Sequence, residues 1–342
     1  MRSSEIKQNR DFGIVVHGGA GSFVQGSSKE FGRRRKDLEQ SATSGFNVLS
    51  KKGSATDAVE EAIRVMEDSG VFNAGKGSCL TIDAKVYVDA ALMNGDLTCG
   101  AIGGGNVAQN PITLARAVME KSDHVLLVGT ENLARFARTI GFPVVPLIPS
   151  ALRLEQYKKY KVEAFKHSLK EWPRNTKLFR HRQYNDNDTV GAVAIDSKGH
   201  VCAGVSTGGR WLKLPGRVGD SALIGAGVYA RSDSGAACAT GMGEEIIRVC
   251  LSKSVCDLMK MGADAQSACD AAINMLTNMI GAGVGGVIAI DRLGRFGASR
   301  NTDLMTRAFR FNSMKRTYVA FLPEHLNPPP SSGGLKRKPL RF

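Results

Sequence analysis

Four short segments in the second half of the chain combine hydroxyl, charged and glycine residues that could perform chemistry. They are Asp188-Thr189-Val190-Gly191-Ala192-Val193, Ser206-Thr207-Gly208-Gly209, Leu214-Pro215-Gly216-Arg217-Val218-Gly219-Asp220 and Ala239-Thr240-Gly241-Met242-Gly243-Glu244. A hydroxyl can attack a carbonyl carbon, a guanidinium can bind a carboxylate, and backbone N–H groups can stabilise an oxyanion. The residue types therefore allow hydrolysis without establishing it.

Each of these features also has a purely structural explanation when it is taken alone. Thr189 and Thr207 fit β-strands, in which threonine is favoured. Arg217 and Asp220 could form a surface ion pair three residues apart, and the glycines before Glu244 could form a turn that enters a helix. Taken one at a time, therefore, these features do not indicate a functional site.

Other catalytic motifs are incomplete. The segment 70–78 resembles a phosphate-binding loop, but Gly77 follows Lys76 where that loop needs a Ser or Thr, and a helix precedes it. The glycine patterns at 225–230 and 281–286 lack a complete βαβ unit around them. The six His form no HxxH or HExxH pattern, and GxSxG does not occur. Nucleotide-binding, zinc-hydrolase and serine-hydrolase sites are therefore not indicated.

Two hairpins and two helices are predicted around the four segments. The first hairpin pairs 189–196 with 200–207, so Thr189 begins one strand and Thr207 ends the other. The second pairs 284–291 with 295–300. Helices are expected at about 243–253 and 263–279.

The first half repeats this combination of strands and helices. We expect a strand at 12–16, ended by a glycine turn at 17–21, and further strands at 85–93, 99–103 and 124–129. We expect helices at 56–68, near 112–120 and near 130–140. A layered α+β domain, interrupted in its middle by a flexible segment, follows from this order.

The interrupting segment, 151–188, is a basic linker. From Arg153 to Arg182 it contains ten Lys or Arg against three Glu, and we expect it to be partly helical and exposed. A tail at about 323–342 is expected to be disordered. Further basic clusters occur at Arg33, Arg34, Arg35 and Lys36 and at Lys336, Arg337, Lys338 and Arg341.

Composition limits the class of protein. The 342 residues have a net charge of +14, but the excess lies in these clusters, so solvated helix faces and tails are favoured over a nucleic-acid partner. No membrane-spanning segment or signal peptide is predicted, and the seven scattered Cys indicate reduced thiols. We expect a cytoplasmic protein, with the basic tail a weak signal for the nucleus.

In the four segments the chain resembles the plant-type (type 2) L-asparaginase and isoaspartyl peptidase family, a branch of the N-terminal-nucleophile (Ntn) hydrolases. The resemblance extends to VVHGGAG, GSATDAVEEAIRVMEDSGVFNAGKGS, VDAALMNG, AIGGGNVAQNPITLARAVM and HVLLVGTENLARFA in the first half. It implies a four-layer αββα sandwich, in which two stacked antiparallel sheets are flanked by helices. The activity implied is hydrolysis of the side-chain amide of L-asparagine and of β-aspartyl (isoaspartyl) peptides, through an ester on the nucleophile.

The resemblance also implies self-cleavage of one structural domain at the bond between Asp188 and Thr189. The products would be residues 1–188, including the basic linker, and residues 189–342. The freed α-amino group of Thr189, with a reference pKa of about 7.7 to 8.0, could then accept the proton of its own hydroxyl. Such a hydrolase needs no catalytic His.

The remaining roles follow from the resemblance. Thr207 would orient the nucleophile, Arg217 would bind the substrate α-carboxylate, and Asp220 would bind its α-ammonium group. The oxyanion hole would be formed by the side chain of Thr240 and the N–H of Gly241, and Gly243 would offer its carbonyl to the ammonium.

No cofactor is implied for catalysis, but a structural sodium ion is. Its backbone ligands would be Met66, Glu67, Ser69, Phe72, Ala74 and Lys76. The processed halves would stay together and pair into a homodimer, and the partner would be a small molecule or short peptide.

Departures from the family pattern leave other functions open. Asp188 stands where glycine is usual and is similar to the residue of glycosylasparaginase and threonine aspartase, while Arg210, Trp211 and Met242 replace smaller residues. Asp220 disfavours a threonine aspartase that cleaves proteins, and the missing signal peptide disfavours a lysosomal glycosylasparaginase. An inactive, uncleaved family member that serves as a basic binding module is the third alternative.

Overall fold

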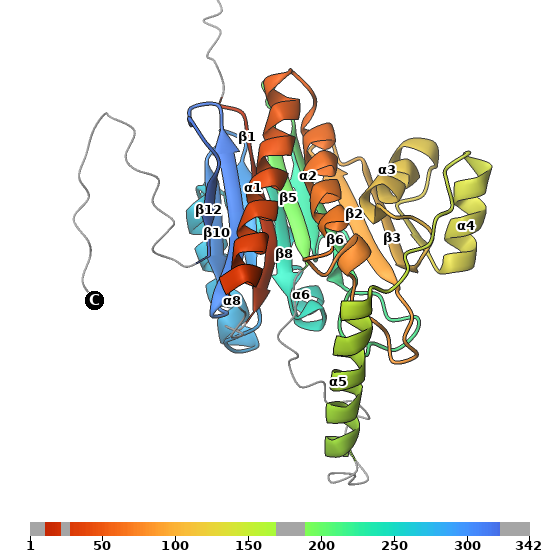
Figure 1. Ribbon diagram of the computed structural model, residues 1–342. Helices are drawn as coiled ribbons and strands as arrows, with labels where there is room; N and C mark the ends of the chain where they lie inside the picture. Colours follow the sequence, from red (N-terminus) through yellow and green to blue (C-terminus); the bar gives the residue numbers. More distant parts are fainter. Residues whose placement is uncertain (1–10, 22–27, 169–188, 322–342) are drawn as a thin grey trace, which may run out of the picture.

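Two stacked β-sheets form the centre of the structure, and helices cover their outer faces (Figure 1). The computed structural model describes residues 11–21, 28–168 and 189–321. In the described residues one sheet has eight strands in the order β12-β11-β1-β5-β6-β2-β3-β4, and the other has four in the order β10-β9-β8-β7. All strand pairs are antiparallel except β3 with β4, which is parallel.

The strands of the larger sheet are β1 (Gly13–Gly21), β2 (Val88–Asn94), β3 (Cys99–Gly105), β4 (Leu126–Val128), β5 (Val190–Ile195), β6 (Val201–Thr207), β11 (Leu304–Phe311) and β12 (Tyr318–Ala320). Those of the smaller sheet are β7 (Val228–Arg231), β8 (Gly235–Gly241), β9 (Gly285–Asp291) and β10 (Phe296–Arg300). The helices are α1 (Ser28–Ser50), α2 (Ala55–Ser69), α3 (Pro111–Lys121), α4 (Thr130–Thr139), α5 (Ala151–Ser168), α6 (Gly243–Val249), α7 (Leu251–Lys260) and α8 (Ala265–Met279). Short 3₁₀ helices occur at Gly75–Gly77 and Asp220–Ala222.

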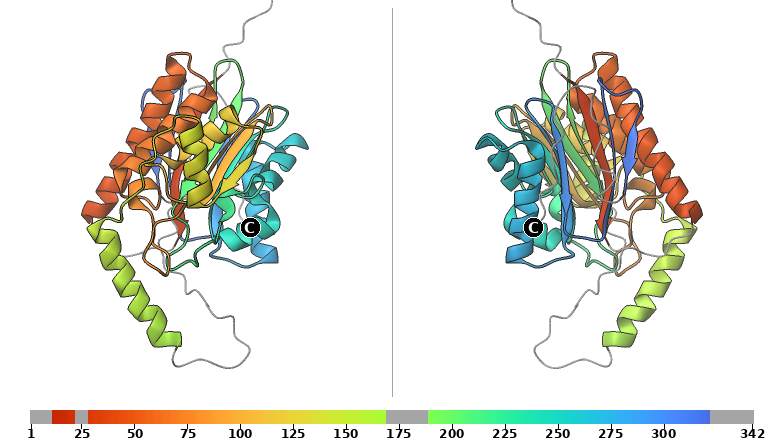
Figure 2. Two further views of the ribbon diagram at one scale, coloured as in Figure 1. Left: turned by 90° about the vertical axis from the view of Figure 1, so that its right-hand side faces the viewer. Right: turned by 90° about the vertical axis from the view of Figure 1, so that its left-hand side faces the viewer.

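Alternating side chains of the central strands create the layers. In β1, Ile14 and Val16 pack against the helical layer that contains α1 and α2, while Val15 packs between the two sheets. In β9, Ile288 faces the larger sheet and Val287 faces α7 and α8. Since successive strand residues point to opposite faces, both faces of each sheet are buried. The views in Figure 2 show the sheets between two helical layers, which confirms the αββα sandwich.

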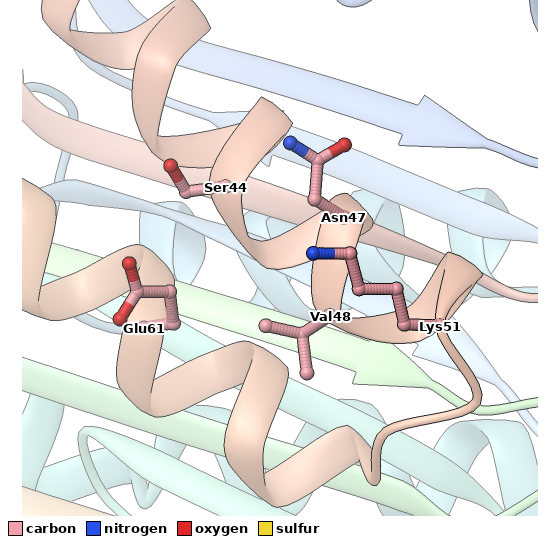
Figure 3. Close-up of a pocket in the computed structure, with 5 residues that line it drawn as sticks. All are labelled: Ser44, Asn47, Val48, Lys51 and Glu61. Atoms are coloured by element: carbon pink, nitrogen blue, oxygen red, sulfur yellow. The ribbon is translucent and has the colours of Figure 1, made fainter.

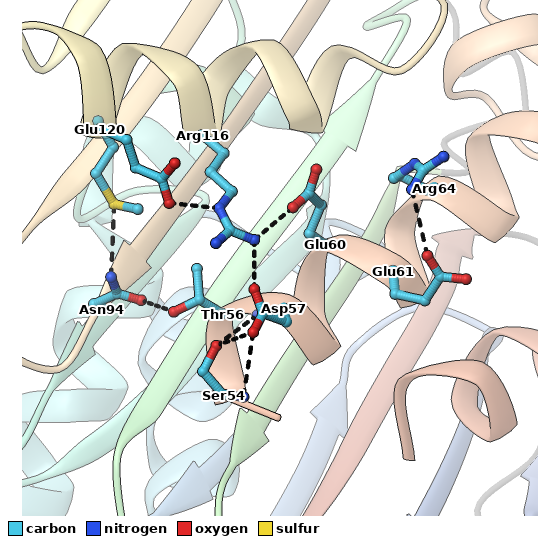
Figure 4. Close-up of polar contacts among 10 residues, drawn as sticks. Ser54, Thr56, Asp57, Glu60, Glu61, Arg64, Asn94, Arg116 and Glu120 are labelled. Atoms are coloured by element: carbon cyan, nitrogen blue, oxygen red, sulfur yellow. Dashed lines mark hydrogen bonds and ion pairs between the residues drawn. The ribbon is translucent and has the colours of Figure 1, made fainter. Parts of the chain in front are cut away.

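Helix α2 has clear local signals for both of its ends. Ser54 and Asp57 form a capping box, in which each side chain bonds the backbone N–H of the other residue, and Gly70 ends the helix in the left-handed region at φ 70°. Arg116 of α3 then binds Asp57 and Glu60 of α2 at 2.7 Å each (Figure 4). The helix that the sequence predicts at 56–68 is thereby fixed over β5, which begins directly after Thr189, and over β6, which ends at Thr207.

The prediction of a glycine turn at 17–21 is wrong. The strand continues to Gly21, with an irregular register against β11 between His17 and Ala20. At Gly18 a Cβ would lie 2.4 Å from the ring of Phe72, so glycine here allows a close approach within the strand.

The single helix expected at 243–253 is broken at Cys250, whose φ is 46°. Beyond the break, the N–H groups of Ser252 and Lys253 bond the carbonyls of Ala226 and Gly225. These partners satisfy the N–H groups that begin a new helix, α7. Sequence analysis had identified neither α1 nor the strands β7, β8, β11 and β12.

The linker is less exposed than expected at its beginning. The first turns of α5 pack on the body through Arg153 and Tyr157, which are 4% and 7% exposed, while the rest of α5 extends away from it (Figure 2). Residues 169–188, including Asp188, and the tail 323–342 lie outside the described residues. None of the helices described has the length and apolar character needed to cross a membrane.

Candidate active site

Thr189 and Thr207 meet where β5 begins and β6 ends. The hydroxyl of Thr189 donates a hydrogen bond of 3.1 Å to Oγ1 of Thr207, and the two residues are 7% and 2% exposed. The N–H of Gly209 donates to the same Thr207 oxygen at 3.0 Å. Because Thr207 accepts both bonds, its own hydroxyl hydrogen is free to point to a third group, and the hydroxyl of Thr189 is held in a fixed direction.

His17 holds the backbone of Thr189 from β1. Its Nδ1 donates to the carbonyl oxygen of Thr189 at 3.1 Å. Burial lowers the pKa of His17 to about 3, partly offset by this bond, so the ring is neutral. Its Nε2 lies against Gly191, where a Cβ would come within 2.3 Å. Sequence analysis assigned His17 no role.

Arg217 and Asp220 lie next to this pair of threonines. A Cβ on Gly209, the residue bonded to Thr207, would lie 3.2 Å from Nη1 of Arg217. A Cβ on Gly243 would lie 2.9 Å from Nη2 of Arg217 and 2.5 Å from Oδ1 of Asp220. The two side chains therefore converge on Gly243 at the start of α6, instead of forming the surface ion pair that their spacing allows.

Asp220 is buried and incompletely paired. It is 5% exposed, and its Oδ2 has no hydrogen-bond partner among the described residues. Burial raises the pKa of Asp220 to about 7, although Arg217 acts in the opposite direction. An unpartnered carboxylate oxygen beside an arginine is suited to a ligand that brings its own cation.

Thr240 and Gly241 end β8 of the smaller sheet. Thr240 is fully buried, and Gly241 has φ 141°, with a potential Cβ only 2.3 Å from the carbonyl oxygen of Val284. The two sheets meet nearby, since a Cβ on Gly191 would lie 2.8 Å from Sγ of Cys238. Thr189 and Thr240 each stand two residues from this contact, on the same strand faces.

Three charged groups at this site were not predicted. Asp89 of β2 is fully buried, accepts from the N–H groups of Gly104 and Gly219 at 2.9 Å each, and lies 4.0 Å from Nη1 of Arg217. Lys213 lies 4.0 Å from the same Asp89 oxygen, and burial lowers its pKa. Glu244 binds Arg217 at 3.0 Å. Only Glu244 had a local signal, its position beside Gly243.

Asn73 was also missed, although it lies within the quoted segment NAGKGS. Its side-chain Nδ2 donates to the backbone carbonyl of Gly209 at 2.6 Å, and the backbone carbonyl of Asn73 accepts from the N–H of Gly208 at 2.9 Å. It thus fixes the turn that follows Thr207.

Comparison with known proteins shows the family. Residues 10–320 match the family model described as Asparaginase. The chain is 45% identical over 303 residues to a plant-type L-asparaginase of Pyrococcus horikoshii, covering 88% of this chain and 97% of the relative. It is 40% identical over 298 residues to an isoaspartyl peptidase/L-asparaginase of Xenopus laevis, covering 86% and 91%.

The chain belongs to the asparaginase family. Its two-sheet sandwich is the Ntn-hydrolase fold of that family. As a member of the family, the chain is a hydrolase. The resemblance identified from the four segments is therefore confirmed.

The turn expected to hold sodium in this asparaginase-family chain follows the C-terminus of α2. A Cβ on Gly75 would lie 2.5 Å from the carbonyl oxygen of Glu67, and one on Gly77 would lie 2.1 Å from that of Phe72. Carbonyl oxygens are ligands for hard cations, and the C-terminus of a helix carries partial negative charge. These close approaches bring backbone carbonyl groups of the turn together, and an ion bound here would be held by backbone alone. The described residues contain no group of three or more His, Cys, Asp or Glu side chains that could hold a metal.

A surface hollow of about 240 Å³ lies elsewhere. It is lined by Ser44, Asn47 and Val48 of α1, by Lys51 just after that helix, and by Glu61 of α2 (Figure 3). None of the residues of the candidate site lines it, so we do not relate it to catalysis.

Proposed function

We propose that this chain is an autoprocessing threonine hydrolase that cleaves the side-chain amide of L-asparagine and the β-aspartyl bond of isoaspartyl peptides, releasing L-aspartate. The observation that carries the proposal is the bond between the hydroxyls of Thr189 and Thr207, beside Arg217 and Asp220, which converge on Gly243. The activities printed for the Pyrococcus and Xenopus relatives agree with this substrate class.

In the proposed reaction the chain first cleaves itself before Thr189. The new α-amino group takes the hydroxyl proton while the oxygen attacks the side-chain carbonyl carbon of the substrate. The oxyanion accepts hydrogen bonds from the side chain of Thr240 and the N–H of Gly241, which in other hydrolases contribute about 3 to 4 kcal/mol each. The leaving nitrogen receives the proton and departs as ammonia or a peptide amine. Water then hydrolyses the ester on Thr189.

The charges of the site favour an α-amino acid unit. The α-carboxylate would bind Arg217, and the α-ammonium would bind Asp220 and the carbonyl of Gly243. A substrate that carries both groups neutralises both side chains, which supports a free amino-terminal aspartyl unit over an internal aspartyl bond of a protein.

The test is made with purified protein and a Thr189→Ala variant. Incubated wild-type protein should give two fragments, the second beginning at Thr189 by mass spectrometry, and should release ammonia from L-asparagine. The variant should stay intact and inactive. Turnover by the variant, or activity of wild-type protein whose Thr189 remains peptide-linked, would refute the proposal.

The same preparation separates the alternatives. Cleavage of peptides with internal aspartyl bonds would indicate a threonine aspartase, and hydrolysis of glycosylated asparagine in preference to asparagine would indicate a glycosylasparaginase. A persistent single band with no turnover would indicate the inactive binding module.

We further propose that the turn at the end of α2 binds a structural sodium ion through the carbonyls of Met66, Glu67, Ser69, Phe72, Ala74 and Lys76. The ion would hold the turn that carries Asn73, and so the contacts of Asn73 with Gly208 and Gly209. Thermal stability should be higher in sodium chloride than in choline chloride of equal ionic strength. Equal stability in both salts would contradict an ion at this turn.

A homodimer of processed chains is the proposed assembly. Exposed apolar side chains on the described surface, such as Ile148 at 84% and Leu152 at 59% exposure, are consistent with a second copy. Light scattering on the processed protein should give twice the chain mass.

A further inference from the structure

The side chain of Glu244 connects two arginines at the site. Its Oε1 accepts from Nε of Arg217 at 3.1 Å and from Nη2 at 3.0 Å, and its Oε2 accepts from Nη1 of Arg210 at 2.9 Å. Both arginines are mostly buried, with side chains 17% and 18% exposed. The three residues form a continuous ionic chain, Arg210 to Glu244 to Arg217.

The geometry of Arg217 shows which part of its guanidinium this chain uses. A guanidinium has two edges that can bind a carboxylate with two parallel bonds, one formed by Nε and Nη2 and the other by Nη1 and Nη2. Glu244 occupies the first edge. At the second edge, Nη1 has Asp89 at 4.0 Å, a distance too long for a hydrogen bond. That second edge has no carboxylate within hydrogen-bond distance among the described residues, and Gly209, Gly219 and Gly243 leave it without a neighbouring Cβ.

The residue after Arg210 packs against the linker helix. This residue, Trp211, is 3% exposed and packs edge-on against Tyr160 of α5, with ring centroids 5.1 Å apart. The guanidinium of Arg153, also from α5, lies 5.8 Å from the Trp211 ring centroid. Immediately before Arg210, the N–H of Gly209 is bonded to Thr207. The backbone at residue 210 is therefore fixed between α5 and the threonine pair.

Charge counting agrees with a site for one anion. Arg210, Arg217 and Lys213 carry three positive charges, and Glu244 and Asp89 carry two negative charges, so one positive charge is in excess when Asp220, which is proposed for the substrate ammonium, is left aside. Arg217 and Arg210 lower the pKa of Glu244 against the effect of its burial, so Glu244 is ionised at neutral pH. A single carboxylate at the second edge of Arg217 would neutralise the group.

We infer that Glu244 and Arg210 are positioning residues, which hold the guanidinium of Arg217 so that its Nη1–Nη2 edge faces the α-carboxylate of the substrate. The inference rests on the proposed function and adds to it the two residues that determine selectivity for a free α-carboxylate. Arg210 is also one of the residues at which the sequence analysis expects this chain to depart from the family pattern.

The experiment compares two substrates that differ only at the α-carboxylate: L-asparagine and its α-amide, L-aspartic acid diamide. Wild-type, Glu244→Gln and Arg210→Met proteins are measured with both. With Glu244→Gln the KM for L-asparagine should rise about tenfold, while kcat stays within about twofold, because ground-state and transition-state binding are lost equally. The rise in KM for Arg210→Met should be smaller, about threefold, because Arg210 contacts Arg217 only through Glu244. For the diamide, kcat/KM should be nearly unchanged in both variants.

Matched controls are available on the same helix, in the residue after Glu244 and in one a turn further along. Glu245 and Arg248 form an ion pair of 2.7 Å outside the site. Glu245→Gln and Arg248→Met should leave kinetics with both substrates unchanged. An Arg210→Lys variant keeps one charged donor. Its KM for L-asparagine should therefore lie between the values of wild type and Arg210→Met.

The outcomes separate this inference from the proposed function. If wild-type protein hydrolyses neither substrate, the proposed function fails. If wild-type protein is active but kcat/KM of the variants falls equally for both substrates, the positioning role fails. It also fails if kcat/KM for L-asparagine does not fall. Should Glu244→Gln not process itself, the same comparison is made with Arg210→Met and Arg210→Lys alone, and equal losses on the two substrates again refute the role.

Discussion

The Nδ1 atom of His17 lies 3.1 Å from the carbonyl oxygen of Thr189, although 172 positions separate the two residues. The bond joins β1 to the residue just before β5 and fixes the backbone of the proposed nucleophile. Since burial keeps the pKa of His17 at about 3, the ring donates this bond as a neutral group.

Replacing His17 tests this positioning role. In His17→Ala the buried carbonyl of Thr189 loses its partner, which costs roughly 1 to 3 kcal/mol, so kcat should fall about tenfold or more. His17→Asn can place an amide N–H near the former Nδ1 and should retain most of the activity. Steady-state kinetics check this, and equal activity of the Ala and Asn variants would argue against the role. Because His17 stays neutral well above pH 3, no ionisation of it should appear in the pH profile of the wild type.

The pKa of Asp220 predicts how substrate capture depends on pH. A substrate ammonium binds the ionised carboxylate, and with a pKa of about 7 that form is lost as the pH falls through 7. The α-amino group of Thr189 is also protonated in this region, so kcat/KM for L-asparagine should fall with a limiting slope of two. For succinamate, which lacks the ammonium, the slope should be one. Identical slopes would remove Asp220 from ammonium binding.

Asp220 should also reduce stability in alkaline solution. Its folded pKa lies above its ordinary value of 3.8, so the cost of burying the ionised group appears as the pH rises from about 4 to above 7. Asp220→Asn should therefore be more stable than wild type at pH 8, by between about 1 and 4 kcal/mol, and the gain should shrink towards pH 4. Denaturant unfolding of the processed proteins at both pH values measures this. A gain that does not change with pH would contradict the assignment.

Gly243 leaves room for Asp220 and Arg217. In Gly243→Ala the new Cβ would lie 2.5 Å from Oδ1 of Asp220, so the carboxylate must move, and the KM for L-asparagine should rise at least tenfold, about 1.4 kcal/mol. Gly32→Ala in α1 is the control, because a Cβ there meets nothing within 4 Å. That variant should keep normal kinetics and gain up to about 1 kcal/mol in stability. Normal kinetics of Gly243→Ala would show that Asp220 can shift without loss.

The two proposed fragments should remain associated after cleavage. Strand β1 lies between β11 and β5, and β2 pairs with β6, so strands from both sides of residue 189 alternate within one sheet. Separating the fragments would break these ladders and expose the core. Size-exclusion chromatography of processed protein should give one peak that contains both fragments and splits only in denaturant. Separation in native buffer would contradict this topology.

The sequence by itself determined the order of the motifs, the hairpin that begins at Thr189 and ends at Thr207, and the helix at 56–68. These depend on signals between near neighbours, such as alternating apolar residues, the Ser54 cap and Gly70. The same signals could not show that the HGGAG segment continues a strand, because its register is set by β11, almost 300 residues later.

Only the tertiary structure decided which groups surround the threonine pair. Asp89 reaches Gly219 across 130 positions, Asn73 reaches Gly209 across 136, and Glu244 meets both Arg210 and Arg217 only because α6 folds back over their loop. Such contacts involve backbone groups and side chains that have no distinctive pattern in the sequence. Their strength depends on burial and short distance, which no local pattern encodes.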